Sequence, residues 1–213
     1  MINNNQTDLQ EAKKVILESL KYFLILSMIC VIVQITLVLD IKFFGTFQQE
    51  DSLIESLQLI FLFSTIYLFF RLAFLIPKLR RSSILIGSFF IVCFIRENDA
   101  ILDNVYHGFW VPVALLVTFI AIFYTFKDWK KGILELAIYL KEPSMKLMIF
   151  SCCLLLVFSR IFGMGSFWKE VMQDKFIYEV KAMIEEGIEL LAYGFILFSA
   201  FLIYKSIKKQ YLK

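Results

Sequence analysis

The chain has 213 residues, of which 60% are hydrophobic and 19% charged, and its net charge is only +3. Soluble domains contain about 45–50% apolar and about 25% charged residues, so this composition excludes an ordinary soluble domain and indicates a membrane protein. The length suits a single integral membrane domain over residues 1–213, and basic residues scattered among short loops argue against a nucleic-acid partner.

The N-terminal segment is too polar for a cleavable signal peptide. Thr7 and Gln10 fit a capping box at the start of a helix. Leu9, Ile16 and Leu20 fall on one face of that helix. The pattern predicts a short amphipathic helix that leads directly into the first membrane span.

Six segments are candidates for membrane spans, each of which needs about 20 mainly apolar residues. Five meet this requirement from composition: residues 20–39, 53–76, 109–126, 147–163 and 182–204. The remaining candidate, residues 83–103, is cleanly apolar only until it reaches Arg96. Because Ala100, Ile101 and Leu102 continue the apolar run, we expect a helix here too. The sequence therefore predicts an all-α bundle of six transmembrane helices.

The distribution of Lys and Arg predicts how this bundle is oriented. With six spans the loops alternate sides, and basic residues concentrate on the cytoplasmic side. Most of them fall on the side of the two termini, and the other side receives only Lys42, Lys169, Lys175 and Lys181. We therefore expect both termini in the cytoplasm (N-in/C-in).

Between the fourth and fifth spans, the segment KGILELAIYLKEP has its own helical pattern. Its apolar residues Ile133, Leu136, Ala137 and Leu140 recur at helical spacing. This favours a short helix lying on the inner membrane surface, and an extension of the fourth span is the alternative.

Charged residues inside the spans collect in the outer half of the predicted bundle. A charge within hydrocarbon costs about 2.5–3.5 kcal/mol on insertion scales, so such residues normally face the bundle interior. At a rise of about 1.5 Å per residue, Arg96, Arg160 and Glu189 fall at similar depths. Asp99 and Asp103 share a helical face with Arg96, and His107 would continue that face if the helix persists. The predicted proton or cation site comprises Glu55, Glu97, Asp99, Asp103, Glu185, Glu186 and Glu189, with Arg96 and Arg160 as charge partners and Gln58 and His107 as further candidates.

Carboxylates outnumber the arginines in this set, so either some are protonated or a cation completes the site. A hard divalent cation such as Ca²⁺ or Mg²⁺ would suit oxygen ligands, although no cofactor is required. Alternatively, Arg96 and Arg160 form structural ion pairs that simply lock helices together. Two further sets are interpreted as packing residues: the cysteines Cys30, Cys93, Cys152 and Cys153, and the glycines Gly163, Gly165, Gly187 and Gly194.

Several enzyme classes are excluded by what the sequence lacks. His107 is the only histidine, which rules out HExxH zinc sites, paired-histidine haem and histidine-rich intramembrane hydrolases. The run Gly163-Met164-Gly165-Ser166 lacks the GxSG order of rhomboid proteases. The chain also has no P-loop or dinucleotide fingerprint.

Three stretches resemble blocks in a group of bacterial polytopic inner-membrane proteins of unassigned function. They are EDSLIESLQLIFLF, FIRENDAILDNVYHGFW and MIEEGIELLAYGFIL, which carry E-D-x-x-x-E, R-E-x-D and E-E-x-x-E patterns. The resemblance supplies no activity. It implies that one site contains Glu50, Asp51, Glu55, Gln58, Arg96, Glu97, Asp99, Glu185, Glu186 and Glu189.

Three hypotheses for function remain open. The first is a small transporter or conducting protein for protons or cations, because intramembrane ionisable residues often mark such pathways. The second is a non-catalytic sensor, anchor or immunity-type protein that acts through a homo-oligomer or a cytosolic protein partner. The third is a metal-dependent intramembrane enzyme acting on a lipid-linked substrate. A non-enzymatic role is favoured because no catalytic motif is present.

Overall fold

The computed structural model describes residues 2–44 and 52–212, and the side chains of residues 8–43 and 52–212. Glu50 and Asp51, which the resemblance assigns to the site, lie outside the described residues. Within the described part every regular element is helical, and no β-strand occurs there.

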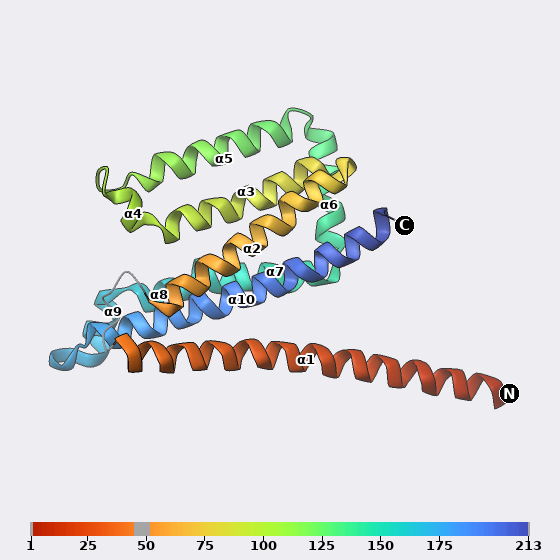
Figure 1. Cartoon of the computed structure of the whole chain (residues 1–213), viewed down its shortest axis with the longest axis horizontal. Helices are drawn as coiled ribbons and strands as arrows, with labels where there is room; N and C mark the ends of the chain where they lie inside the picture. Colours follow the sequence, from red (N-terminus) through yellow and green to blue (C-terminus); the bar gives the residue numbers. More distant parts are fainter. Residues whose placement is uncertain (1, 45–51, 213) are drawn as a thin grey trace.

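Six long helical rods lie roughly side by side and make up the body of the molecule (Figure 1). Five of them are α1 (Ile2–Phe44), α2 (Leu53–Leu75), α3 (Arg80–Glu97), α5 (Trp110–Phe126) and α10 (Tyr178–Tyr211). The sixth joins α7 (Pro143–Cys153), the π-helical segment η2 (Leu154–Phe158) and α8 (Ser159–Gly163). The bundle is therefore all-α, as predicted.

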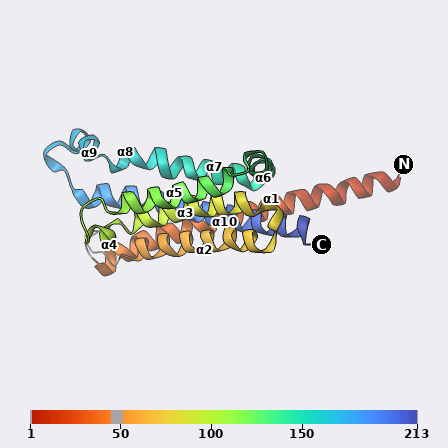
Figure 2. The ribbon, with the colours of Figure 1, turned by 90° about the horizontal axis from the view of Figure 1, so that it is seen from above.

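Short elements close the two ends of the bundle (Figures 1 and 2). The end that carries both termini also holds α6 (Trp129–Lys141) and the 3₁₀ turn η1 (Pro77–Leu79). The opposite end holds α4 (Asp99–Asp103) and α9 (Gly165–Met172), and the 3₁₀ turn η3 (Gln173–Lys175) follows α9. In Figure 2 the N-terminal part of α1 extends beyond the other helices.

Four described segments are long and apolar enough to cross a membrane. They are Asp8–Phe43, Leu53–Leu75, Pro143–Gly163 and Tyr178–Tyr211, and the pair α5–α6 would make a fifth if counted as one bent span. These helices indicate an integral membrane protein. The third predicted span is not apolar enough to count among them, because α3 carries two arginines at one end and Arg96-Glu97 at the other.

The predicted helix over residues 83–103 is wrong in its C-terminal part. α3 ends at Glu97, because Asn98 folds back and its side-chain amide donates to Phe94 O at 2.8 Å. α4 then starts a separate turn at Asp99. The chain leaves helical conformation after Asn104, and Gly108 has a positive φ of 85°. The face that would have aligned Arg96 with Asp103 and His107 therefore does not form.

The N-terminal region forms one helix with the first predicted span, and the amphipathic helix expected there stays a prediction. α1 is one continuous helix that begins at Ile2, so Thr7 lies inside it and does not cap it. Leu9, Ile16 and Leu20, the expected amphipathic face, are 56%, 65% and 50% exposed. No separate surface helix precedes the span in the described residues.

α6 is a distinct helix that crosses the end of the bundle, because its axis is bent by 103° from α5. An extension of the fourth span is thus excluded. Glu135 of α6 is buried and accepts hydrogen bonds from the backbone N–H groups of Arg81 and Ser82, at 2.9 and 3.2 Å. These are among the N–H groups at the start of α3 that have no partner within the helix. A further bond, 2.5 Å, joins the hydroxyls of Tyr139 and Ser83, and burial raises the pKa of the Tyr139 phenol, so that hydroxyl stays protonated.

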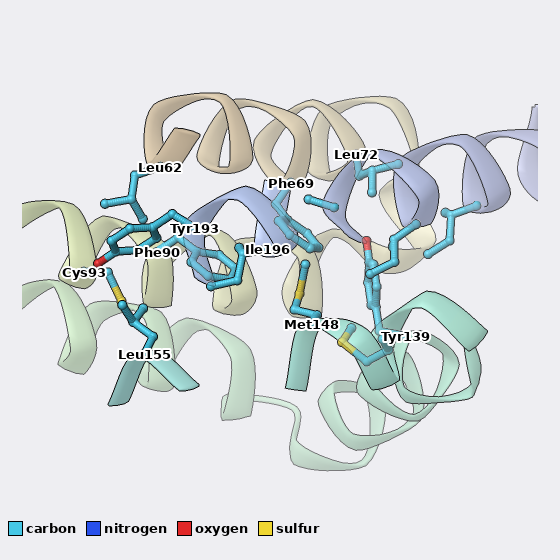
Figure 3. Packing of buried hydrophobic residues seen from close by; sticks show 14 of the residues in the cluster. Leu62, Phe69, Leu72, Phe90, Cys93, Tyr139, Met148, Leu155, Tyr193 and Ile196 are labelled. Atoms are coloured by element: carbon cyan, nitrogen blue, oxygen red, sulfur yellow. The ribbon is translucent and has the colours of Figure 1, made fainter. Parts of the chain in front are cut away.

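α10 forms the centre of the bundle. Its side chains Leu190, Tyr193 and Ile196 are fully buried. Around them pack apolar residues of α2, α3 and the α7–η2 rod, including Phe69 and Phe90, whose ring centroids are 6.0 Å apart (Figure 3).

Two of the four predicted packing glycines let α1 approach α10 closely. A Cβ atom at Gly194 would lie 2.7 Å from Ile29, and one at Gly187 would lie 3.2 Å from Leu37. Gly163 is also required, since a Cβ there would collide with the Glu185 carboxylate. The prediction is wrong for Gly165, because a Cβ atom at that position would lie more than 4 Å from the surrounding described residues.

Candidate ion-binding site

Glu189 lies at the centre of the charged residues in the half of the bundle that is farther from the two termini. Its side chain is only 6% exposed, and α10 places it between α3 and α8. Its Oε1 atom forms an ion pair with Arg160 and lies 4.0 Å from Arg96 Nη1. The hydroxyl oxygen of Ser159 lies 3.1 Å from the same atom. One buried carboxylate therefore joins two guanidinium groups from two different rods.

Glu97 completes this cluster on the α3 side. It accepts hydrogen bonds from Arg96 at 3.1 Å and from the Tyr193 hydroxyl at 2.8 Å. Its side chain is 13% exposed. We call Arg96, Glu97, Arg160 and Glu189 the arginine-paired group; with both carboxylates ionised, its charges sum to zero. Such balance is what a buried set of charges requires.

The π-helical segment η2 lies directly before Ser159 and Arg160, the two residues that the rod made of α7, η2 and α8 contributes. Single π-helical turns are rare and frequently occur at functional sites. Here the altered register is followed at once by Ser159 and Arg160, which both reach Glu189. Just beyond, the indole of Trp168 donates to Phe162 O at 2.6 Å and caps the end of α8.

A second cluster lies on the neighbouring face of α10, toward α1 and α2. We call Asp40, Glu55 and Glu186 the acidic group. Asp40 Oδ1 accepts from the backbone N–H of Leu53 at 3.0 Å, so Asp40 caps the start of α2. Gln58 donates to the backbone carbonyl of Glu186 at 3.3 Å, which ties α2 to α10.

The electrostatics of the two groups differ. Glu186 is half-buried, and the charged groups that act on it most strongly are the carboxylates of Glu55, Asp40, Glu185 and Glu189. Asp40 is 3% exposed, and within the described residues its Oδ2 atom has no hydrogen-bond partner. Glu185 belongs to neither group, because it pairs with Lys181 at 2.8 Å. Repulsion around Glu186 is the feature that a bound proton or cation would relieve.

Asp99 is exposed at the break after α3, but its charge still acts on Arg96 and Glu97. Two other predicted site residues lie elsewhere. Asp103 and His107 pair with each other at 3.0 Å in the turn beyond α4, and the His107 side chain is fully exposed. Asp103 also accepts from the backbone N–H of Gly108 at 2.9 Å, so it stabilises that turn. These residues were expected to join the others only because a continuous third helix was predicted.

Three residues of the site were not predicted from the sequence. Asp40 lies one position beyond the predicted first span, where a polar flanking residue is unremarkable. Ser159 and Tyr193 have common residue types inside apolar runs. The available signal was spacing: Tyr193 lies four residues after Glu189, and Ser159 immediately precedes Arg160.

The described residues give no support to the expected Ca²⁺ or Mg²⁺ site. Among them, no three His, Cys, Asp or Glu side chains converge closely enough to hold a metal ion. The carboxylates around Glu186 are near enough to repel one another, yet they are not arranged as a ligand set. The hypothesis of a metal-dependent enzyme therefore gains nothing from this geometry.

In comparisons with protein-family models, curated proteins and solved structures, nothing matches this chain. The resemblance to bacterial inner-membrane proteins stays a prediction, and function must be argued from the site itself.

Proposed function

We propose that all six rods cross a bacterial inner membrane, with both termini in the cytoplasm. α3 and α5 run alongside the four qualifying helices (Figure 1), and the charges of α3 lie at its ends, where arginines can reach the interface. Both termini share one end with α6, and that end carries most of the basic residues. The positive-inside rule assigns such an end to the cytoplasm.

The proposed function of this protein is transport or conduction of protons or small monovalent cations through a site in the outer half of the bundle. One observation carries the proposal: α10 holds Glu189, which pairs with two arginines, and three residues before it Glu186, on which other carboxylates are the charged groups that act most strongly. Asp40 of α1 and Glu55 of α2 face Glu186, whereas Arg96 and Glu97 of α3 and Arg160 of α8 face Glu189. Intramembrane ionisable residues of this kind commonly mark ion pathways.

In this proposal Glu186 and Glu189 exchange the transported ion. They are three residues apart on α10 and influence each other electrostatically. A proton or cation that binds at the acidic group relieves repulsion there. Its transfer to Glu189 would weaken the ion pairs to Arg96 and Arg160, which couples binding to the packing of α10 against α3 and α8.

The packing in the inner half of the bundle limits the route by which such an ion could leave the site. Between the Glu97–Tyr193 bond and the Ser83–Tyr139 bond lie Phe69, Met148 and Ile196, which pack together in the core (Figure 3). An apolar layer of this type blocks a static polar route through the described residues. A transporter that moves between conformations therefore fits better than a permanently open pore.

Flux into proteoliposomes tests the proposal. The purified protein is reconstituted with a pH-sensitive dye inside the vesicles, and proton and sodium flux are measured under an imposed gradient. Flux is expected with the wild type and should be lost with Glu189→Gln. Glu170→Gln is the control, because Glu170 is an exposed carboxylate of α9 that belongs to neither group. Equal flux in wild type, Glu189→Gln and empty vesicles would overturn the proposal.

The second candidate is a sensor or anchor that acts through a cytosolic protein partner. The observation in its favour is α6, which Glu135 fixes across the bundle end while Ile133, Leu134 and Leu140 remain 49%, 67% and 53% exposed. Replacing Leu134 with Ser should then abolish signalling or assembly without changing ion flux. A variant that loses flux instead would exclude this reading.

A further inference from the structure

An apolar groove runs along the side of the bundle between α3, α5 and the α7–η2 rod. Its volume is about 540 Å³. Carbon atoms dominate its lining, which includes Phe89, Val92, Ile122, Ile149, Cys153 and Val157. Ile149 and Val157 are 49% and 70% exposed, so the groove opens sideways toward the surrounding lipid. Its shape and chemistry suit a hydrocarbon chain.

Two guanidinium groups stand at the outer end of the groove. Arg96 follows the lining residue Val92 by one helical turn, and Arg160 follows Val157 by three residues. Both arginines contact the same Glu189 oxygen, so their charged groups are close together. Their side chains remain 36% and 41% exposed.

The arginines retain hydrogen-bonding capacity on their exposed side. A guanidinium has five N–H donors. Within the described residues, Arg96 bonds through Nη1 and Arg160 through Nη2. The remaining donors are available to an acceptor outside the cluster. Two adjacent guanidinium groups favour a phosphate, which they bind in a bidentate manner more readily than a carbonyl group.

The position of this pair matches the level of lipid headgroups. Arg96 is one residue from the end of α3, and Arg160 is three residues from the end of α8, so both lie within about 5 Å of the outer helix ends. Phe162, Phe167 and Trp168 form an aromatic cluster immediately beyond Arg160. Aromatic residues of this kind are enriched at the membrane–water interface.

We propose that this groove binds one acyl chain of an anionic phospholipid, whose phosphate is held by Arg96 and Arg160. The acyl chain covers the apolar walls, and the phosphate takes the guanidinium donors that Glu97 and Glu189 leave unused. The inference is independent of ion transport, since it requires only the groove and the exposed side of the arginine-paired group.

Native mass spectrometry of the protein released from nanodiscs tests this proposal. Nanodiscs contain equal amounts of phosphatidylglycerol and phosphatidylcholine with identical chains. One phosphatidylglycerol should remain bound to the wild type. Cys153→Phe fills the groove without touching the charged residues and should reduce retention by about tenfold. Leu116→Phe is its control, because Leu116 is 61% exposed on α5 and does not line the groove.

A second pair of variants separates the headgroup from the chain. Arg160→Gln should lower phosphatidylglycerol retention by about tenfold, because one charge-assisted hydrogen bond is worth about one decade in binding constant. Arg71→Gln, an exposed arginine on α2, should change nothing. If Arg160→Gln fails to fold, Cys153→Phe still tests whether the groove binds the lipid. Equal retention of both lipids by the wild type, or unchanged retention in Cys153→Phe, would overturn the proposal.

Discussion

The ion pair between Glu189 and Arg160 can be tested by a double-mutant cycle on stability. The cycle compares the wild type with Glu189→Gln, Arg160→Gln and the double variant. Glutamine keeps the length and an acceptor oxygen, so Ser159 can still donate to position 189. Glu189→Gln removes only the charge, whereas Arg160→Gln also shortens the side chain and removes the guanidinium donors.

The expected magnitude follows from burial. Removing one partner from a fully buried ion pair costs about 3–5 kcal/mol, because the other charge is left unpaired. Glu189 is 6% exposed but Arg160 is 41% exposed, so water can solvate the arginine and the cost must be discounted. We expect Glu189→Gln to lower the free energy of unfolding by about 1–2 kcal/mol and Arg160→Gln by about 2–3 kcal/mol. The second change costs more because it leaves the buried carboxylate without its partner. The coupling energy should be about 1–2 kcal/mol.

Reversible unfolding in mixed dodecyl sulfate and non-ionic detergent micelles measures these free energies. Glu185→Gln serves as the comparison for losing an acidic charge on the same helix. Strict additivity of the two single variants would refute the reasoning, because it would mean that Arg160 and Glu189 do not interact in the folded protein.

Three further predictions use the same unfolding assay. Glu135→Ala should cost about 2–5 kcal/mol, because two buried N–H groups of α3 lose their acceptor, while Ala at the exposed Glu170 should have no effect. Gly194→Val should cost about 1–3 kcal/mol by pushing α1 off α10, whereas Gly165→Ala should be neutral; equal effects would contradict the close approach. Asp40→Asn should leave stability unchanged or raise it, because the amide oxygen can still cap α2, and a large loss would show that Asp40 needs its charge.

Several features of the fold could be predicted because they follow from local composition. Runs of about 20 apolar residues identify helices directly, and α2 begins where the sequence predicts, with Ser52 as its N-cap. The short helix α6 was also predictable, since its apolar residues recur at helical spacing. Depth along the helix axis was sufficient to bring Arg96, Arg160 and Glu189 to one level, and the structure places them in contact.

What failed depended on the backbone between helices and on non-local contacts. The third helix was extended to Asp103 because apolar residues continue past Asn98, yet the side chain of Asn98 competes for the backbone and ends the helix. The role of Asp40 depends on α1 meeting the start of α2, which no local pattern reveals. The role of Glu135 could not be predicted either, because its partners lie in α3, more than 50 residues away in sequence.

We propose that the carboxylates around α10 bind an ion in the folded protein. Infrared difference spectroscopy of the reconstituted protein measures this directly, because protonated and ionised carboxyl groups absorb separately. We predict a carboxyl signal that changes when the pH is altered or sodium is added, and that is missing in Glu186→Gln but present in Glu170→Gln. A spectrum identical in the wild type and Glu186→Gln under all these conditions would contradict the account.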